Sequence, residues 1–323
     1  MICPFRPLQS AIRPLMYNVM KTSSTVLGDI PIGDWIDRLS PLSIRPYLRL
    51  MRLDRPIGTW LLLLPGWWSI ALAAKDWPDP RLLFLFGIGA VVMRGAGCTF
   101  NDVVDCGFDG RVARTAARPI PSGAVTPLQA VLFLALQLVA GLLILLQFNA
   151  TSVALGAASL VLVFTYPFMK RITYWPQAWL GLTFNWGALL GWATADGGLN
   201  WAPVLLYIGG IFWTLGYDTI YAHQDKQDDA LIGVRSTALR LGTATPYWLI
   251  GFYALAVVLF AGAGWVADLS WPFFLVLLLA AIQLFWQIRT LDIDDSQNCL
   301  EKFKSNRVFG WVMMIAIVAG KIL

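Results

Sequence analysis

Apolar residues fill this chain in long runs, and short charged or Pro- and Gly-containing segments separate the runs. Uncharged runs of about 18 or more residues predict helices that cross a membrane. Nine candidate spans follow, some with one or two charged residues, at approximately residues 56–74, 82–102, 128–147, 150–168, 175–194, 202–222, 245–265, 271–288 and 307–323. The pattern therefore predicts an all-α fold: a polytopic membrane helix bundle of about nine transmembrane helices, with a polar cap formed by the cytoplasmic loops.

Composition supports a membrane protein. Apolar residues make up 58% of the chain, charged residues only 13%, and the mean hydropathy is +0.64, whereas soluble domains carry about 25% charged residues. The four cysteines form no CxxC pair, which argues against a zinc site or a disulfide framework. The net charge of +5 comes from basic residues spread between the hydrophobic runs, so we expect no nucleic-acid partner and assign the lipid bilayer as the environment.

The distribution of Lys and Arg predicts the orientation. With the N-terminus on the inner side, only Lys75, Arg81 and Lys321 fall outside, leaving 21 of the 24 basic residues inside, as short cytoplasmic loops require. Tryptophans near the predicted span ends suggest an interfacial aromatic belt; these are Trp67, Trp68, Trp77, Trp175, Trp201 and Trp271. We expect a multi-pass protein of a bacterial inner (plasma) membrane with a cytoplasmic N-terminus, and the mitochondrial inner membrane is the alternative.

The first 50 residues differ from the rest, so we expect an N-terminal extension (1–50) and a transmembrane domain (51–323). No acidic residue precedes Asp29, and an acid-poor basic stretch could be a mitochondrial presequence. We favour a cytoplasmic extension in which Trp35 to Leu50 form an amphipathic helix on the membrane surface.

Acidic residues gather at two span ends. If the second span continues as a helix, Asn101, Asp105 and Asp109 are spaced i, i+4, i+8 and share one face. Asp218, Asp225 and Asp229 follow the sixth span with the spacing i, i+7, i+11, which predicts a second shared face. Four spans separate the two groups, so both are expected on the same side of the membrane.

Carboxylates at a membrane boundary are functional candidates. Oxygen ligands without His or Cys favour Mg²⁺, which proteins usually bind together with substrate phosphates. We therefore predict a diphosphate site, and the alternative is a pair of solvated acidic loops. Basic residues beside the acidic groups fit this prediction because guanidinium and ammonium groups bind phosphate; they are Arg111, Arg114, Arg118, Lys170, Arg171, Lys226, Arg235 and Arg240.

Two unrelated functions compete with this interpretation. A CDP-alcohol phosphatidyltransferase would need aspartates where Cys106 and Pro127 stand, so that pattern fails at its metal ligands. A cation-coupled transporter would place its acids near the membrane midplane, whereas these acids cluster at one face.

Four polar segments lie along the chain in order: RLDRPIGTW (52–60), NDVVDCGFDGRVARTAARPIPSG (101–123), YPFMKRITYWPQ (166–177) and DTIYAHQDKQDDALIGVRST (218–237). They resemble the UbiA superfamily of intramembrane aromatic prenyltransferases, over roughly residues 50 to 310. Within the superfamily they look most like the subgroup that prenylates 4-hydroxybenzoate in ubiquinone biosynthesis. Haem O synthase, chlorophyll synthase and homogentisate-type relatives remain alternatives that differ in the acceptor.

The resemblance implies a reaction and assigns residues. An NDxxDxxxD motif and a DxxxD motif would bind the diphosphate of a polyprenyl donor through Mg²⁺, and the allylic cation would attack the ring carbon ortho to the hydroxyl of 4-hydroxybenzoate. The implied catalytic and metal-binding residues are Asn101, Asp105, Asp109, Asp225 and Asp229. The expected substrate-binding residues are Arg55, Arg114, Arg118, Tyr166, Lys170 and Tyr221, the tyrosines acting through their ring faces.

Overall fold

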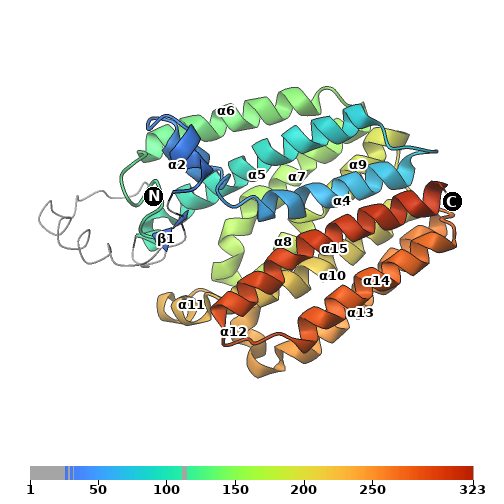
Figure 1. The fold of residues 1–323 in the computed structure, drawn as a ribbon. Coiled ribbons are helices and arrows are strands. Elements are labelled where there is room, and N and C mark those ends of the chain that lie inside the picture. Colours follow the sequence, from blue (N-terminus) through green and yellow to red (C-terminus); the bar gives the residue numbers. More distant parts are fainter. Residues whose placement is uncertain (1–25, 28–29, 32, 111–114, 323) are drawn as a thin grey trace, which may run out of the picture. The chain divides into compact units, whose positions relative to one another are not determined.

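The protein is helical almost throughout, which confirms the predicted fold class. A computed structural model describes residues 26–27, 30–31, 33–110 and 115–322. Two short antiparallel strands, β1 (Val26–Leu27) and β2 (Ile30–Pro31), precede the helices (Figure 1). The helices are α2 (Trp35–Leu39), α3 (Arg45–Leu50), α4 (Ile57–Ala73), α5 (Pro80–Asp109), α6 (Pro127–Leu145), α7 (Ala150–Ile172), α8 (Pro176–Phe184), α9 (Trp186–Asp196), α10 (Trp201–His223), α11 (Lys226–Ile232), α12 (Thr237–Leu241), the 3₁₀ turn η1 (Gly242–Ala244), α13 (Thr245–Val266), α14 (Trp271–Arg289) and α15 (Ser296–Ile322).

The predicted count of nine membrane spans is not confirmed. All nine apolar stretches are helical where described, but six helical stretches are long and apolar enough to cross a membrane. The other three predicted stretches do not reach the length or apolarity of a membrane span. α4 has 17 residues against the roughly 20 that span the hydrocarbon core, the stretch 175–194 is divided at Asn185, and α10 carries Asp218.

Asn185 lies between α8 and α9, at the point where the fifth predicted span divides, and its side chain makes two hydrogen bonds. Its Nδ2 donates to the carbonyl oxygen of Gly181 at 2.9 Å and to Thr214 Oγ1 at 2.8 Å. The second bond reaches α10, where Gly210 has no Cβ to collide with the amide. The break therefore fixes α8 and α9 against α10.

The chain divides into two compact units, Met1–Pro56 with Gly95–Val139 and Ile57–Arg94 with Ala140–Leu323. In the first unit, Leu50, Ile120, Val125 and Ala130 form a buried apolar cluster. The predicted amphipathic helix from Trp35 to Leu50 is wrong as one element, because α2 ends at Leu39 and α3 begins at Arg45. Pro41, which cannot donate to a helical ladder, lies in the gap.

In the second unit, buried aromatic rings hold α4, α10 and α15 together. The ring centroids of Trp68 and Trp213 lie 5.3 Å apart, and those of Trp213 and Phe309 lie 5.1 Å apart. Trp68 Nε1 donates to the carbonyl oxygen of Gly310 at 2.8 Å, which satisfies the indole in the core. Trp68 therefore does not belong to an interfacial belt, whereas Trp77, Trp201 and Trp271 are exposed.

Candidate active site

The acidic column predicted for α5 exists as a continuous helix. α5 runs from Pro80 to Asp109 without interruption, so Asn101, Asp105 and Asp109 occupy successive turns of one face. Asp105 is 1% exposed and Asp109 is 8% exposed. Buried carboxylates are costly unless cations or hydrogen bonds compensate them, so their partners decide what the column can do.

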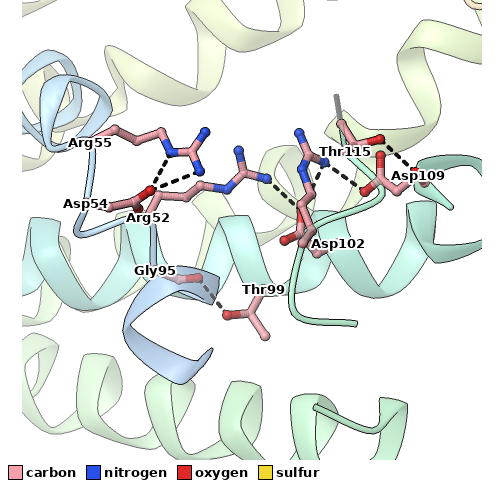
Figure 2. Close-up of polar contacts among 9 residues, drawn as sticks. Arg52, Asp54, Arg55, Gly95, Thr99, Asp102, Asp109 and Thr115 are labelled. Atoms are coloured by element: carbon pink, nitrogen blue, oxygen red, sulfur yellow. Dashed lines mark hydrogen bonds and ion pairs between the residues drawn. The ribbon is translucent and has the colours of Figure 1, made fainter. Parts of the chain in front are cut away.

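Arginines from two other segments of the first unit reach this column. Arg118 Nη1 lies 2.7 Å from Asp109 Oδ2 and 3.4 Å from Asp102 Oδ1. Arg52 Nη2 lies 2.7 Å from the same Asp102 oxygen. Figure 2 marks this contact with a dashed line. Asp102 was not among the predicted site residues, yet it joins both arginines. Its position between Asn101 and Asp105 in the motif was a signal, but its pairing with Arg52 depends on a contact across 50 residues.

Asp109 is buried among charges of both signs. Burial raises the pKa of Asp109, the Arg118 guanidinium lowers it, and the negative charges of Asp102 and Asp105 raise it again. The Thr115 hydroxyl donates to the carbonyl oxygen of Asp109 at 2.8 Å and fixes the chain where α5 ends (Figure 2). Burial and the two neighbouring carboxylates therefore act against the charged form of Asp109, whereas Arg118 stabilises it.

A second carboxylate–arginine group precedes α4. The Asp54 side chain is fully buried, and its Oδ2 accepts from Arg55 Nε and Nη2 at 3.0 Å each. Burial raises the pKa of Asp54, whereas the charges of Arg55 and Arg52 lower it. Arg55, predicted to bind substrate, therefore contacts a neighbouring carboxylate in this structure. The predicted substrate residue Arg114 lies outside the described residues.

The second acidic group, in the second unit, is arranged differently from the prediction. α10 ends at His223 and α11 begins at Lys226, so Asp218 and Asp225 do not share one continuous helical face. The predicted i, i+7, i+11 face is therefore wrong. Asp225 and Asp229 do stand one turn apart, since Asp229 N donates to the carbonyl oxygen of Asp225 at 2.9 Å. Because α10 ends before Asp225, this residue occupies the N-cap position of α11 and does not continue the face of α10 that carries Asp218.

The other predicted substrate residues of the second unit lie near helix ends. Lys170 is in the last turn of α7, and its carbonyl oxygen accepts from Arg235 N at 2.8 Å, which ties α7 to the segment after α11. The rings of Tyr221 and Phe303 stack with centroids 4.4 Å apart. Tyr166 packs against the main buried apolar cluster.

Arg94, which lies within an apolar stretch of α5, was not among the predicted site residues. Its guanidinium sits 5.3 Å from the centroid of the Phe184 ring and interacts electrostatically with Asp218 of α10. Gly58 makes room for it, because a Cβ there would lie 2.6 Å from Arg94 Nε. That Nε is buried and has no hydrogen-bond partner among the described residues. An arginine inside a hydrophobic run is itself a candidate for a functional residue, so the sequence did contain a signal for Arg94.

The donor atoms fit Mg²⁺ by their chemistry. Among the described residues, no three His, Cys, Asp or Glu side chains meet in a cluster that could hold a metal ion by itself. The α5 column nevertheless offers hard oxygen donors, namely two carboxylates and the amide oxygen of Asn101. Beside it, Asp102 Oδ2 is buried with no hydrogen-bond partner in the described part of the chain.

Fold and charges together define a multi-span membrane protein with buried carboxylates and arginines at a helix end. The model of the UbiA prenyltransferase family matches residues 62–314. A mitochondrial 4-hydroxybenzoate polyprenyltransferase of Arabidopsis thaliana is 53% identical over 319 residues, covering 94% of this chain and 78% of that protein. The chain therefore belongs to the UbiA prenyltransferase family, and the resemblance predicted from its motifs is confirmed.

Two solved structures share the fold. The apo structure of a UbiA homologue from Aeropyrum pernix K1 is 23% identical with a TM-score of 0.65 and covers 82% of this chain and 97% of that chain. A UbiA homologue from Archaeoglobus fulgidus bound to GPP and Mg²⁺ is 17% identical with a TM-score of 0.62, covering 85% of this chain and 99% of that chain.

Proposed function

We propose that this protein transfers a polyprenyl group from a polyprenyl diphosphate to the ring carbon ortho to the hydroxyl of 4-hydroxybenzoate, a step of ubiquinone biosynthesis. The observation that carries the proposal is the 53% identity to a 4-hydroxybenzoate polyprenyltransferase along 94% of the chain. The buried carboxylate column of α5 supplies the matching chemistry.

The diphosphate end of the donor is assigned to the charged residues. Asn101, Asp105, Asp109, Asp225 and Asp229 would hold Mg²⁺, consistent with their oxygen donors and with the Mg²⁺ bound to the Archaeoglobus homologue. When bound, the metal supplies positive charge that stabilises the leaving diphosphate. Convergence of the two acidic groups on one diphosphate remains a prediction.

Basic residues would share the diphosphate charge. In this structure, Arg118 forms ion pairs with Asp109 and Asp102. A metal ion bound to those carboxylates would free the guanidinium group to bind phosphate oxygens. Arg114, Lys170 and Arg55 are assigned the same role on their charge and on their place in the motifs.

In the transfer step, the allylic C–O bond breaks and its electron pair leaves with the diphosphate. The ring carbon of the acceptor then bonds to the allylic carbon, and loss of the ring proton restores aromaticity. Tyr166 and Tyr221 would stabilise the cation with their ring faces and keep water away. The stack of Tyr221 on Phe303 fixes the orientation of one of these rings.

Arg94 is the residue we assign to the acceptor. An aromatic acid needs a cation for its carboxylate and an apolar surface for its ring, and Arg94 lies against Phe184 with one buried donor unused. A guanidinium can pair with a carboxylate through two parallel hydrogen bonds. Homogentisate also carries a carboxylate, so this contact selects aromatic acids as a class.

We infer a mitochondrial membrane as the location. The expected bacterial membrane has no support, whereas the Arabidopsis relative is named a mitochondrial protein. The absence of acidic residues before Asp29 also fits the presequence alternative. We keep residues 51–323 as the proposed transferase domain and 1–50 as an extension; the family match at 62–314 lies within the former.

Membranes containing the protein should convert labelled 4-hydroxybenzoate to a prenylated product when a polyprenyl diphosphate and Mg²⁺ are added. Asp105→Ala and Asp225→Ala should each lower turnover by at least about a hundredfold, because each removes a ligand that supports the leaving group. The amount of folded protein should remain close to that of the parent. Unchanged turnover in both variants would contradict the assigned site.

A further inference from the structure

Arg235, from the segment between α11 and α12, closes the end of α7. Its backbone N–H donates to the carbonyl oxygen of Lys170 at 2.8 Å, and its Nη1 donates to the carbonyl oxygen of Ile172 at 2.5 Å. The guanidinium carbon lies 5.3 Å from the centroid of the Tyr174 ring. The last carbonyls of a helix lack partners within it and carry partial negative charge, so a cation that donates to them is stabilising. Arg235 therefore fixes its own segment on the last turn of α7.

The turn that precedes Arg235 reaches back to the second acidic group. Gly233 ends α11 in a left-handed conformation with φ of 74°. The N–H groups of Gly233 and Val234 both donate to the carbonyl oxygen of Asp229. Because Arg235 follows Val234 directly, one tight turn joins the backbone of Asp229 to the end of α7. The position of Asp229, which we assign to the metal, thus depends on where Arg235 is held.

The chain beyond Arg235 is anchored in the core of the second unit. Thr237 is 0% exposed, its N–H donates to Gln177 Oε1 of α8 at 3.1 Å, and its hydroxyl lies 2.8 Å from that of Thr219 in α10. By contrast, α11 has seven residues and exposes Leu231 to 85%. A helix this short is not stable in water by itself, so the position of α11 depends on the contacts at its ends. Arg235 extends the buried anchor at Thr237 back toward α11.

We propose that Arg235 is a positioning residue for the transfer reaction; the proposal rests on the transferase function above. Its contacts hold Asp229 and Lys170, which belong to different loops and are both assigned to the diphosphate, in one fixed arrangement. Groups that must first be ordered bind a ligand more weakly, because the freedom they lose is subtracted from the binding free energy. The guanidinium of Arg235 is directed at a backbone oxygen and a ring, so Arg235 acts through its neighbours and does not touch the substrate.

Arg235→Met tests this role, because it removes the guanidinium and keeps a long side chain. With solanesyl diphosphate, 4-hydroxybenzoate and Mg²⁺, we expect kcat/KM for the donor to fall about tenfold or more, since small displacements of positioned groups can cost up to about a hundredfold. The KM for 4-hydroxybenzoate should remain unchanged. Arg235→Lys keeps the charge and should recover part of the loss. Arg289→Met, at another exposed arginine in the last turn of a helix (α14), is the matched control and should change neither value.

Hydrogen exchange distinguishes positioning from direct contact. In the ligand-free protein in detergent micelles, the amides of residues 226–234 should exchange faster in Arg235→Met than in the parent, and Arg235→Lys should restore part of the protection. A lower kcat/KM with unchanged exchange would overturn the proposal in favour of a direct contact with the diphosphate. Faster exchange with unchanged kinetics would overturn it as well, because the contacts would then be structural only, and so would no change in either measurement. Failure of the proposed function is recognised separately, as a parent protein that forms no prenylated product.

Discussion

Arg52 and Asp102 lie 50 residues apart in sequence, and their side chains meet at 2.7 Å. Arg52 holds a left-handed backbone conformation with φ of 58°, which costs a non-glycine residue about 1 kcal/mol. Asp102 is 1% exposed, so its charge needs this partner. The contact joins the segment before α4 to the acidic column and makes the column part of the folded core of the first unit.

Arg52→Ala should therefore lower the free energy of unfolding by about 3 kcal/mol, because it leaves a buried carboxylate with only the 3.4 Å contact from Arg118. Unfolding in detergent micelles, followed by circular dichroism, measures the change. Arg38→Ala, at an exposed position of α2, is the control and should cost less than about 0.5 kcal/mol. Adding Asp102→Asn to Arg52→Ala should recover part of the loss. Equal losses in the two alanine variants would show that the ion pair contributes nothing.

Arg94→Met should raise the KM for 4-hydroxybenzoate by about tenfold or more, since it removes a charge-assisted contact. The KM for the donor should stay within about twofold, and Arg94→Lys should recover part of the acceptor affinity. Initial rates at varied acceptor and donor concentrations separate these effects. Arg81→Met, an exposed position of the same helix, is the matched control. A rise in donor KM alone would assign Arg94 to the diphosphate instead.

Asp54→Asn should reveal a pH-dependent stability. Burial raises the pKa of Asp54 in the folded state above its unfolded value of about 3.9. Its contribution to stability is thus fully present below about pH 4 and is lost as the pH rises through the folded pKa. The neutral variant avoids this loss, so its Tm relative to the parent should increase from pH 4 to pH 7. Asp76→Asn, in the exposed turn before α5, is the control. A difference that shrinks with rising pH would contradict the assigned cause.

Gly191→Ala should destabilise the second unit because α4 and α9 approach through glycine. A Cβ at Gly191 would lie 2.5 Å from the carbonyl oxygen of Gly66, and backbone cannot give way as a flexible side chain can. Overpacking of this kind costs about 1–3 kcal/mol. Gly251→Ala, in open space on α13, should instead leave stability unchanged or slightly higher. Detergent-based thermal unfolding of both variants measures the contrast, and similar Tm values would argue against close helix packing here.

The long apolar runs located the helices well, since each predicted stretch corresponds to one helix or, for 175–194, to two. They did not reveal the division between α8 and α9 at Asn185, whose side chain donates to Thr214 of α10. A polar residue inside an apolar run does not reveal whether its amide faces its own helix or a neighbour. The turn between the end of α10 at His223 and the start of α11 at Lys226 was not predicted either.

The sequence by itself determined the membrane fold, the family and the acidic motifs, because long apolar runs and ordered motif spacings are properties of neighbouring residues. Only the tertiary structure decided the partners: Arg52 for Asp102, Arg118 for Asp109, and Phe184 and Asp218 for Arg94. Such pairs depend on how distant helices pack and on which buried charges need compensation. An unpaired charge that is removed from water costs free energy, so buried charges must find partners. Charges leave water only once the chain is folded.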